Sequence, residues 1–181
     1  MWISPLTKIN AFELDELFWF LKTRKGYENG INTYIMTMIS RLPRQILGFD
    51  VDNSVKSKTI QAIVDGVPSA EKYYTDGGKA YMDVIFGGKH IRNIEDKKDT
   101  HEIESTNADL RHYIAGLARR SRCFFRSKET LYAVLSVFID AYNKYGEAKM
   151  KYRKPVIHKT PNPKKHLHKY RDTPFSILNF F

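Results

Sequence analysis

Three strand-like segments follow one another at the start of the chain, and this order constrains the fold more than any other feature. Residues 11–21 become apolar on both alternating faces toward their end, as in a strand that is covered on both sides. Residues 31–39 are rich in β-branched and aromatic side chains and follow a turn-forming stretch. Pro43 interrupts the run before a third such segment, residues 45–51. Because the connections are short, the three segments are expected to form an antiparallel meander.

Helices and short strands alternate in the rest of the chain. Six elements are expected, on the spacing of their apolar residues: a helix at 60–67, a strand at 72–75, a short helix at 80–85, a short strand at 89–91, a long helix at 103–117 and a last helix at 129–145 that Gly146 caps. This order predicts an α/β fold with a ribonuclease-H-like mixed sheet. Three antiparallel strands are followed by alternating helices and short strands, and helices cover both faces of the sheet.

Positive charge is spread unevenly along the chain. The formal net charge is +10, which favours a polyanionic partner. Residues 151–171 hold eight Lys or Arg and no acid, so 148–181 is expected to be a flexible basic tail. Residues 12–147 are expected to form one ribonuclease-H-like domain after a lead-in, residues 1–11.

Cysteine usage and hydropathy exclude several classes of protein. Cys123 is the single cysteine, which leaves no disulfide framework and no cysteine-based zinc ribbon in this sequence. No apolar run is long enough to span a bilayer, and the first residues lack a signal-peptide pattern. A cytoplasmic protein without a membrane partner is therefore expected.

Three acids stand where a metal site could form beside this positive charge. Asp15 lies inside the first strand, where an unpaired carboxylate is costly to bury. Asp76 ends the fourth strand, and Glu104 opens the long helix. In the expected fold, Asp15 and Asp76 can lie side by side and Glu104 can complete the trio. Carboxylate oxygens suit Mg²⁺ or Mn²⁺, and two such ions about 3.5–4 Å apart promote phosphodiester chemistry.

Each acid also has an ordinary structural interpretation. Asp15 could be a strand-end charge, Asp76 the first residue of an Asp-Gly turn, and Glu104 a first-turn acid favoured by the helix dipole. Glu16 and Glu102 could exchange with Asp15 and Glu104 if the strand or the helix were rotated. The joint occurrence of the three acids favours the trio Asp15, Asp76 and Glu104.

Basic side chains follow the third acid closely. From Arg111 to Lys128 the chain carries six Lys or Arg and no acid. Asn107 and Arg111 fall on the same helical stripe as Glu104, although a solvated helix face would explain that stripe equally well. Candidate contacts to a DNA backbone are therefore Asn107, Arg111, Arg119, Arg120, Arg122, Arg126 and Lys128.

Several of these residues belong to linked motifs that resemble a known family. The pattern consists of Leu14-Asp15-Glu16, Thr75-Asp76-Gly77 with Tyr81, Thr100-x-x-Ile103-Glu104-x-x-Asn107-x-x-Leu110-Arg111, and Cys123-Phe124-x-Arg126-Ser127. In order and spacing, over roughly residues 12–145, it resembles the insertion-sequence-one family of DDE transposases, in its InsB-type catalytic half. One departure is Gly78, where that family usually carries tryptophan.

The resemblance implies a function and partners. It implies that Asp15, Asp76 and Glu104 bind two Mg²⁺ or Mn²⁺ ions, and that the protein is a DNA transposase. Such an enzyme hydrolyses phosphodiesters at element ends and then joins the 3′ hydroxyl to target DNA. The family further implies a homo-oligomer in a synaptic complex at the nucleoid of a prokaryotic cell. It also implies an upstream zinc-ribbon and helix-turn-helix region, fused by frameshifting.

Three other functions remain open on the sequence. The first is a truncated, non-catalytic DNA-binding transposase remnant that acts as a regulator. The second is a related metal-dependent nuclease that stops at hydrolysis. The third is a basic RNA-binding protein in which the acids are incidental.

Overall fold

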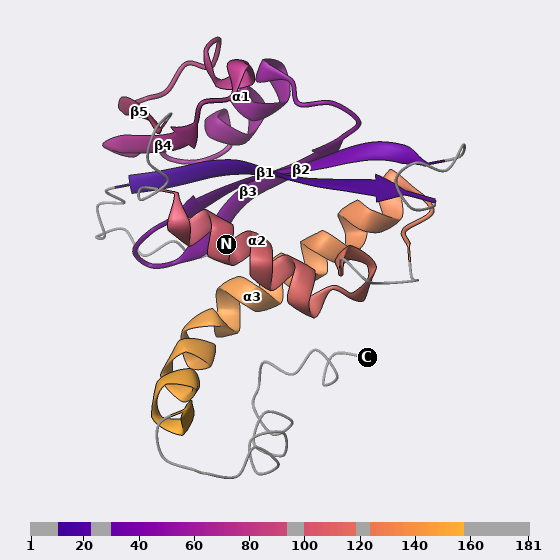
Figure 1. Cartoon of the computed structure of the whole chain (residues 1–181). Coiled ribbons are helices and arrows are strands. Elements are labelled where there is room, and N and C mark those ends of the chain that lie inside the picture. Colours follow the sequence, from indigo (N-terminus) through magenta and orange to yellow (C-terminus); the bar gives the residue numbers. More distant parts are fainter. Residues whose placement is uncertain (1–10, 23–29, 94–99, 119–123, 158–181) are drawn as a thin grey trace. The chain divides into compact units, whose positions relative to one another are not determined.

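The computed structural model describes residues 11–22, 30–93, 100–118 and 124–157. Its five strands form a single mixed sheet (Figure 1) in the order β3-β2-β1-β4-β5. β2 is antiparallel to both β1 and β3, whereas β4 is parallel to β1 and β5 is parallel to β4. This arrangement confirms the predicted ribonuclease-H-like mixed sheet. The strands are β1 (Ala11–Leu21), β2 (Ile31–Ser40), β3 (Gln45–Asp52), β4 (Lys72–Asp76) and β5 (Lys89–Asn93).

The central strand, β1, has neighbours on both edges, and its register fixes where the acids lie. It pairs with β4 in parallel from Ala11 opposite Lys72 to Glu13 opposite Tyr74. Continuing this register by two residues places Asp15 opposite Asp76. The position of the two aspartates therefore follows from strand pairing rather than from a loop.

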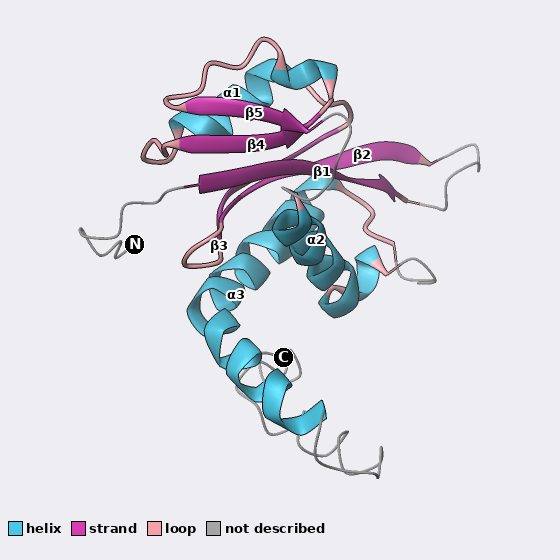
Figure 2. Cartoon of the chain, turned by 60° about the vertical axis from the view of Figure 1, so that its left-hand side comes forward, coloured by secondary structure: helices cyan, strands magenta, loops and turns pink. Residues whose placement is uncertain are grey.

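Helices cover both faces of the sheet, as predicted. α1 (Ser57–Asp65) and α2 (His101–Tyr113) lie on opposite faces (Figures 1 and 2). Successive side chains of a strand point to opposite faces, so alternate side chains of β1 face α1 and α2. Phe12 and Leu14 are buried in the apolar cluster that also contains the α1 side chains. Glu13, by contrast, bonds to the backbone of α2.

The helix ends differ from the prediction in several places, and α1 covers Ser57–Asp65 rather than 60–67. The short helix expected at 80–85 is a single 3-10 turn, Lys79–Tyr81. α2 ends at Tyr113 because Ile114 is extended (φ −96°, ψ 102°), and the chain continues as a second 3-10 turn, Ala115–Leu117. Both β-branched residues and glycine weaken a helix, and Ile114 and Gly116 lie where α2 ends. The buried stripe through Leu117 is nevertheless retained.

The last helix, α3 (Lys128–Ile157), runs past the predicted end at Tyr145. The predicted cap at Gly146 is wrong, since the helix continues through this residue. A glycine inside a helix costs only about 1 kcal/mol relative to alanine, and the strong helix formers Glu147, Ala148, Lys149 and Met150 follow it.

Two compact units divide the chain, Met1–Val134 and Leu135–Phe181, and the division falls within α3. All of the acids discussed below belong to the first unit. The domain limits expected from the sequence, 12–147 and 148–181, stay a prediction. Among the described helices, none combines the length and the apolar character that crossing a bilayer requires.

Candidate metal centre

Asp15 lies within β1 with its side chain on the face that α2 covers. Its Oδ2 accepts a hydrogen bond of 2.8 Å from Asn107 Nδ2 of α2. Burial raises the pKa of Asp15 to about 6, and the charges of Asp76 and Glu104 contribute to the rise, while the bond from Asn107 opposes it. A carboxylate is thus held away from water and close to other acids, where its charged form is costly.

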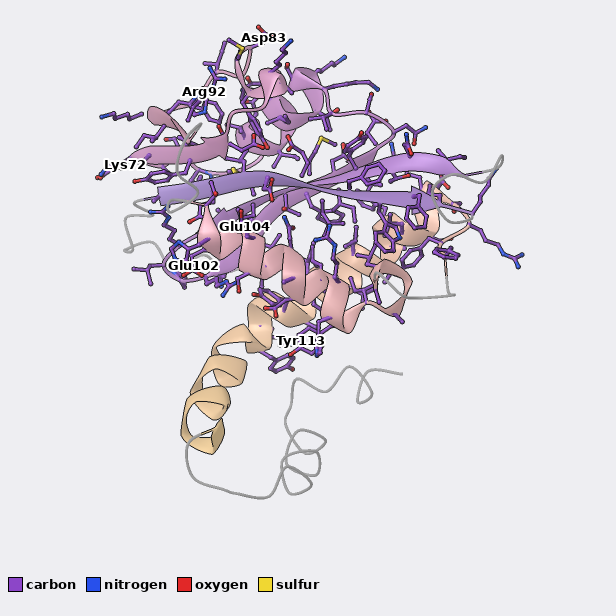
Figure 3. All side chains as sticks on the ribbon, in the orientation of Figure 1. Lys72, Asp83, Arg92, Glu102, Glu104 and Tyr113 are labelled. Carbon is purple, nitrogen blue, oxygen red and sulfur yellow. The ribbon has the colours of Figure 1, made fainter. Side chains whose placement is uncertain are left out.

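Asp76 ends β4 and is exposed at the start of a tight turn. Its Oδ1 accepts a 2.8 Å hydrogen bond from the backbone N–H of Gly78. Arg92 of β5, labelled in Figure 3, donates from Nη2 to the carbonyl of Gly77 at 3.0 Å. A Cβ at position 78 would lie 2.9 Å from Asp76 Oδ1, closer than real Cβ atoms approach other atoms. Glycine at this position therefore allows the carboxylate to stand where it does.

Glu16 joins these two aspartates and was not expected as an additional member of the site. One carboxylate oxygen from each of Asp15, Glu16 and Asp76 lies within 4.8 Å of the other two. Burial raises the pKa of Glu16 to about 7, with contributions from Asp76 and Asp15, and a hydrogen bond from Tyr81 opposes the rise. The pKa of Tyr81 is raised well above its ordinary value by burial and by Glu16. The sequence pattern predicts Glu16 only as a replacement for Asp15.

Glu104 is exposed on the first turns of α2, on the same stripe as Asn107. Figure 3 shows it on the part of α2 that lies beside β1. Its charge is close enough to raise the pKa of Asp15. Among the described residues, however, the group within 4.8 Å does not include it. A metal-binding role for Glu104 stays a prediction.

Glu102, the other acid in the first turn of α2, is engaged elsewhere. Its Oε2 lies 3.2 Å from Arg44 Nη1, and its Oε1 lies 3.2 Å from His101 Nε2. Arg44 also donates from Nη2 to the Glu102 carbonyl at 3.0 Å. These contacts hold the helix against the turn between β2 and β3, and among the described residues Glu102 is not part of the group formed by Asp15, Glu16 and Asp76.

The predicted DNA contacts fall into different surroundings, and their roles stay predictions. Asn107 is only 4% exposed and bonds to Asp15, whereas Arg111 is half-buried and Arg126 is exposed. Lys128 at the start of α3 has its Nζ 3.9 Å from Asp52 Oδ1. The other three candidates, Arg119, Arg120 and Arg122, lie outside the described residues.

The donor set fits a hard divalent cation. Every candidate ligand in the group is a carboxylate oxygen, which Mg²⁺ and Mn²⁺ prefer over zinc-type nitrogen and sulfur ligands. Opposite ligands of one Mg²⁺ stand about 4.2 Å apart, twice the usual bond length of about 2.1 Å. The three oxygens all lie within 4.8 Å of one another, a range that includes this distance.

Two solved structures resemble this chain distantly. One is the Mos1 transposase paired-end complex with left transposon end: 11% identity, 74% of this chain, 48% of that chain and a TM-score of 0.49. The other is the simian T-cell lymphotropic virus intasome in complex with PP2A regulatory subunit B56 gamma: 16% identity, 60% of this chain, 40% of that chain and a TM-score of 0.46.

No protein-family model and no curated protein matches the sequence. The chain spans less than half the length of either structural neighbour that it matches. At such identities a likeness carries no activity with it. Function has to be inferred from this chain's own side chains.

Proposed function

We propose that this chain is the catalytic part of a DNA transposase of the insertion-sequence-one type. Asp15, Asp76 and Glu104 would hold two Mg²⁺ or Mn²⁺ ions. The reaction would be hydrolysis of phosphodiesters at element ends, followed by joining of the 3′ hydroxyl to target DNA. One observation carries the proposal. Asp15 and Asp76 are 61 positions apart in the chain, yet their carboxylate oxygens lie in the same cluster of acids.

The arrangement of the acids lowers the stability of the folded chain, and such a cost favours a functional role for them. Burial and mutual repulsion raise the pKa of both Asp15 and Glu16. Titratable groups perturbed in this way by burial and by specific charged neighbours concentrate at functional sites. A divalent cation would remove the repulsion, and it would supply charge neutralisation for a reacting phosphodiester.

Neighbouring groups keep the two aspartates in place. The amide of Asn107 fixes one oxygen of Asp15, and the N–H of Gly78 fixes one oxygen of Asp76. The charge of the exposed acid Glu104 contributes to the raised pKa of Asp15, and Glu104 would complete the set on the α2 side. Arg111 and Arg126 would contact the DNA backbone, together with the basic residues between them.

The proposal extends to the assembly and its place in the cell. DNA at element ends and in the target would be the partner, in a complex that contains several copies of this chain. A zinc-ribbon and helix-turn-helix region would supply end recognition. The complex would act at the nucleoid of a prokaryotic cell.

Nicking of supercoiled plasmid DNA in the presence of Mn²⁺ tests the proposal. Asp76→Asn and Glu104→Gln should reduce nicking by more than the roughly 10–100-fold that changes around a metal ligand cost. Glu102→Gln is the matched control on α2, since Glu102 pairs with Arg44, and it should retain most of the activity. Equal activity of all four proteins would refute the proposed roles of Asp76 and Glu104.

A second assay separates the transposase from its rivals. Incubation with a donor DNA that carries a free 3′ hydroxyl should produce joined strands in the presence of Mn²⁺. Nicking without joined strands would identify a nuclease instead. Binding of DNA with neither product would identify a non-catalytic DNA-binding protein.

A further inference from the structure

We infer that Glu13 is a positioning residue that anchors α2 to β1 and thereby sets where Glu104 and Asn107 stand relative to Asp15. The inference rests on the proposed function for its effect on metal binding. Glu13 lies two residues before Asp15, on the same face of β1. Its side chain is fully buried, with 0% of its surface exposed. A buried carboxylate needs partners for both oxygens, and each oxygen of Glu13 has one.

The first partner is the start of α2. Glu13 Oε2 accepts a hydrogen bond of 2.9 Å from the backbone N–H of Ile103. The first N–H groups of a helix have no acceptor within the helix, and in α2 the N–H of Glu104 bonds to the carbonyl of the N-cap residue, Thr100. Thr100 makes no side-chain capping bond. A carboxylate from β1 therefore serves as the cap, and it also suits the positive end of the helix dipole.

The second partner is Arg41 in the turn after β2. Its Nε forms an ion pair and a hydrogen bond with Glu13 Oε1. The guanidinium lies 3.9 Å above the ring centre of Tyr74 in β4. Glu13 thus joins β1 to the turn after β2 and to the first turn of α2, and Arg41 extends this link to Tyr74 of β4.

The consequence for the site follows from helix geometry. Glu104 is the residue after Ile103, and Asn107 is one turn further along. The bond from Glu13 to Ile103 and the bond from Asn107 to Asp15 tie α2 to the same face of β1, two strand residues apart. Without the bond from Glu13 to Ile103, the first turn of α2 loses one of its contacts with β1, and Glu104 lies on that turn.

Glutamine at position 13 provides a sharp perturbation, because it keeps the shape but replaces one acceptor with a donor. In Glu13→Gln the new N–H₂ must face either Arg41 or Ile103 N–H, and both are donors. The double variant Glu13→Gln with Arg41→Met removes this conflict and lets the glutamine oxygen face Ile103. Ile60→Val is the matched control, since it trims a buried side chain in the α1 layer on the other face of the sheet.

Mn²⁺ titration and plasmid nicking are measured for the four proteins. Glu13→Gln should weaken Mn²⁺ binding on the order of 10–100-fold, with the concentration of Mn²⁺ for half-maximal nicking shifted by the same factor. The double variant should regain most of this loss, and Ile60→Val should lose none. A Glu13→Gln protein with wild-type Mn²⁺ affinity, or one that the Arg41→Met change does not rescue, would overturn the inference.

Amide hydrogen exchange separates this inference from the proposed function. In the wild type without metal, the Ile103 amide should be protected by Glu13, and Glu13→Gln should speed its exchange at least about tenfold, because the amide loses a hydrogen bond to a charged acceptor. If the wild type neither binds Mn²⁺ nor cuts DNA, the proposed function fails. The rate of hydrogen exchange at the Ile103 amide then still tests whether Glu13 anchors α2 to β1. Unchanged exchange at Ile103 would overturn the anchor as well.

Discussion

Replacing Asp15 with asparagine should stabilise the metal-free protein at neutral pH, although it removes a proposed metal ligand. The pKa of Asp15 is about 6 instead of 3.8, chiefly because burial disfavours the charged form. Between these pH values the folded chain retains a proton that the unfolded chain has released. At about 1.36 kcal/mol for each pH unit, the displacement corresponds to roughly 3 kcal/mol of lost stability.

The pH range of this loss follows from the two pKa values. The unfolded state binds fewer protons than the folded state between about pH 4 and pH 6, so the free energy of unfolding falls as pH rises through that range and then levels off. Glu16, whose pKa is about 7 instead of 4.5, contributes a similar loss up to about pH 7. The two contributions do not simply add, because the charge of Asp15 itself raises the pKa of Glu16.

Urea denaturation followed by circular dichroism at pH 4 and pH 8, with a chelator present, measures the effect. At pH 8, Asp15→Asn should be more stable than the wild type by roughly 2–3 kcal/mol, and the difference should vanish at pH 4. Asp83→Asn, an exposed acid outside the carboxylate group, is the control and should shift stability by less than about 0.5 kcal/mol. An Asp15→Asn protein that is no more stable than the wild type at pH 8 would refute the reasoning.

Three further outcomes are expected from the contacts around the site. Asn107→Ala removes the hydrogen bond to Asp15, so Mn²⁺ titration should show affinity weakened on the order of 10–100-fold; unchanged affinity would show that the amide does not orient Asp15. Gly78→Ala pushes a Cβ against Asp76 Oδ1, and misplacement by about 1 Å can cost about 100-fold in rate, so nicking should fall steeply while the urea midpoint stays near that of the wild type. Mn²⁺ affinity in the wild type should rise from pH 5 to pH 8, because Asp15 and Glu16 must release protons to bind a cation; a constant affinity across this range would contradict the raised pKa values.

The sheet could be predicted from the sequence because local patterns decide it. Strands joined by short turns, such as β1, β2 and β3, pair antiparallel. A helix between two strands allows the crossover that parallel pairing requires. Helix ends are harder to predict, because each end depends on small differences in helix propensity between neighbouring residues. α2 stops before Ile114, and α3 continues through Gly146, although both segments show the expected apolar spacing.

The acids of the site were only partly accessible to sequence reasoning. Asp15 and Asp76 could be paired because the fold places β1 beside β4. Glu16 was considered only as a substitute for Asp15, because consecutive strand residues point to opposite faces. Asp76 stands at the end of its strand, and its carboxylate comes within reach of both Asp15 and Glu16.

Glu13 was missed for a different reason. It lies in the same strand as Asp15, but its partners Arg41 and Ile103 are 28 and 90 positions away along the chain. No spacing within β1 indicates that a glutamate will cap a distant helix. The acid pattern therefore predicted which residues meet near the site, but not which residue holds α2 in place.

Diffraction from crystals soaked in Mn²⁺, recorded with anomalous scattering, tests the central claim most directly. The account predicts a strong anomalous peak at coordinating distance, about 2.1 Å, from carboxylate oxygens of Asp15 and Asp76, with Glu104 turned toward the same ion or a second one. A saturated crystal without a peak between Asp15 and Asp76 would contradict it.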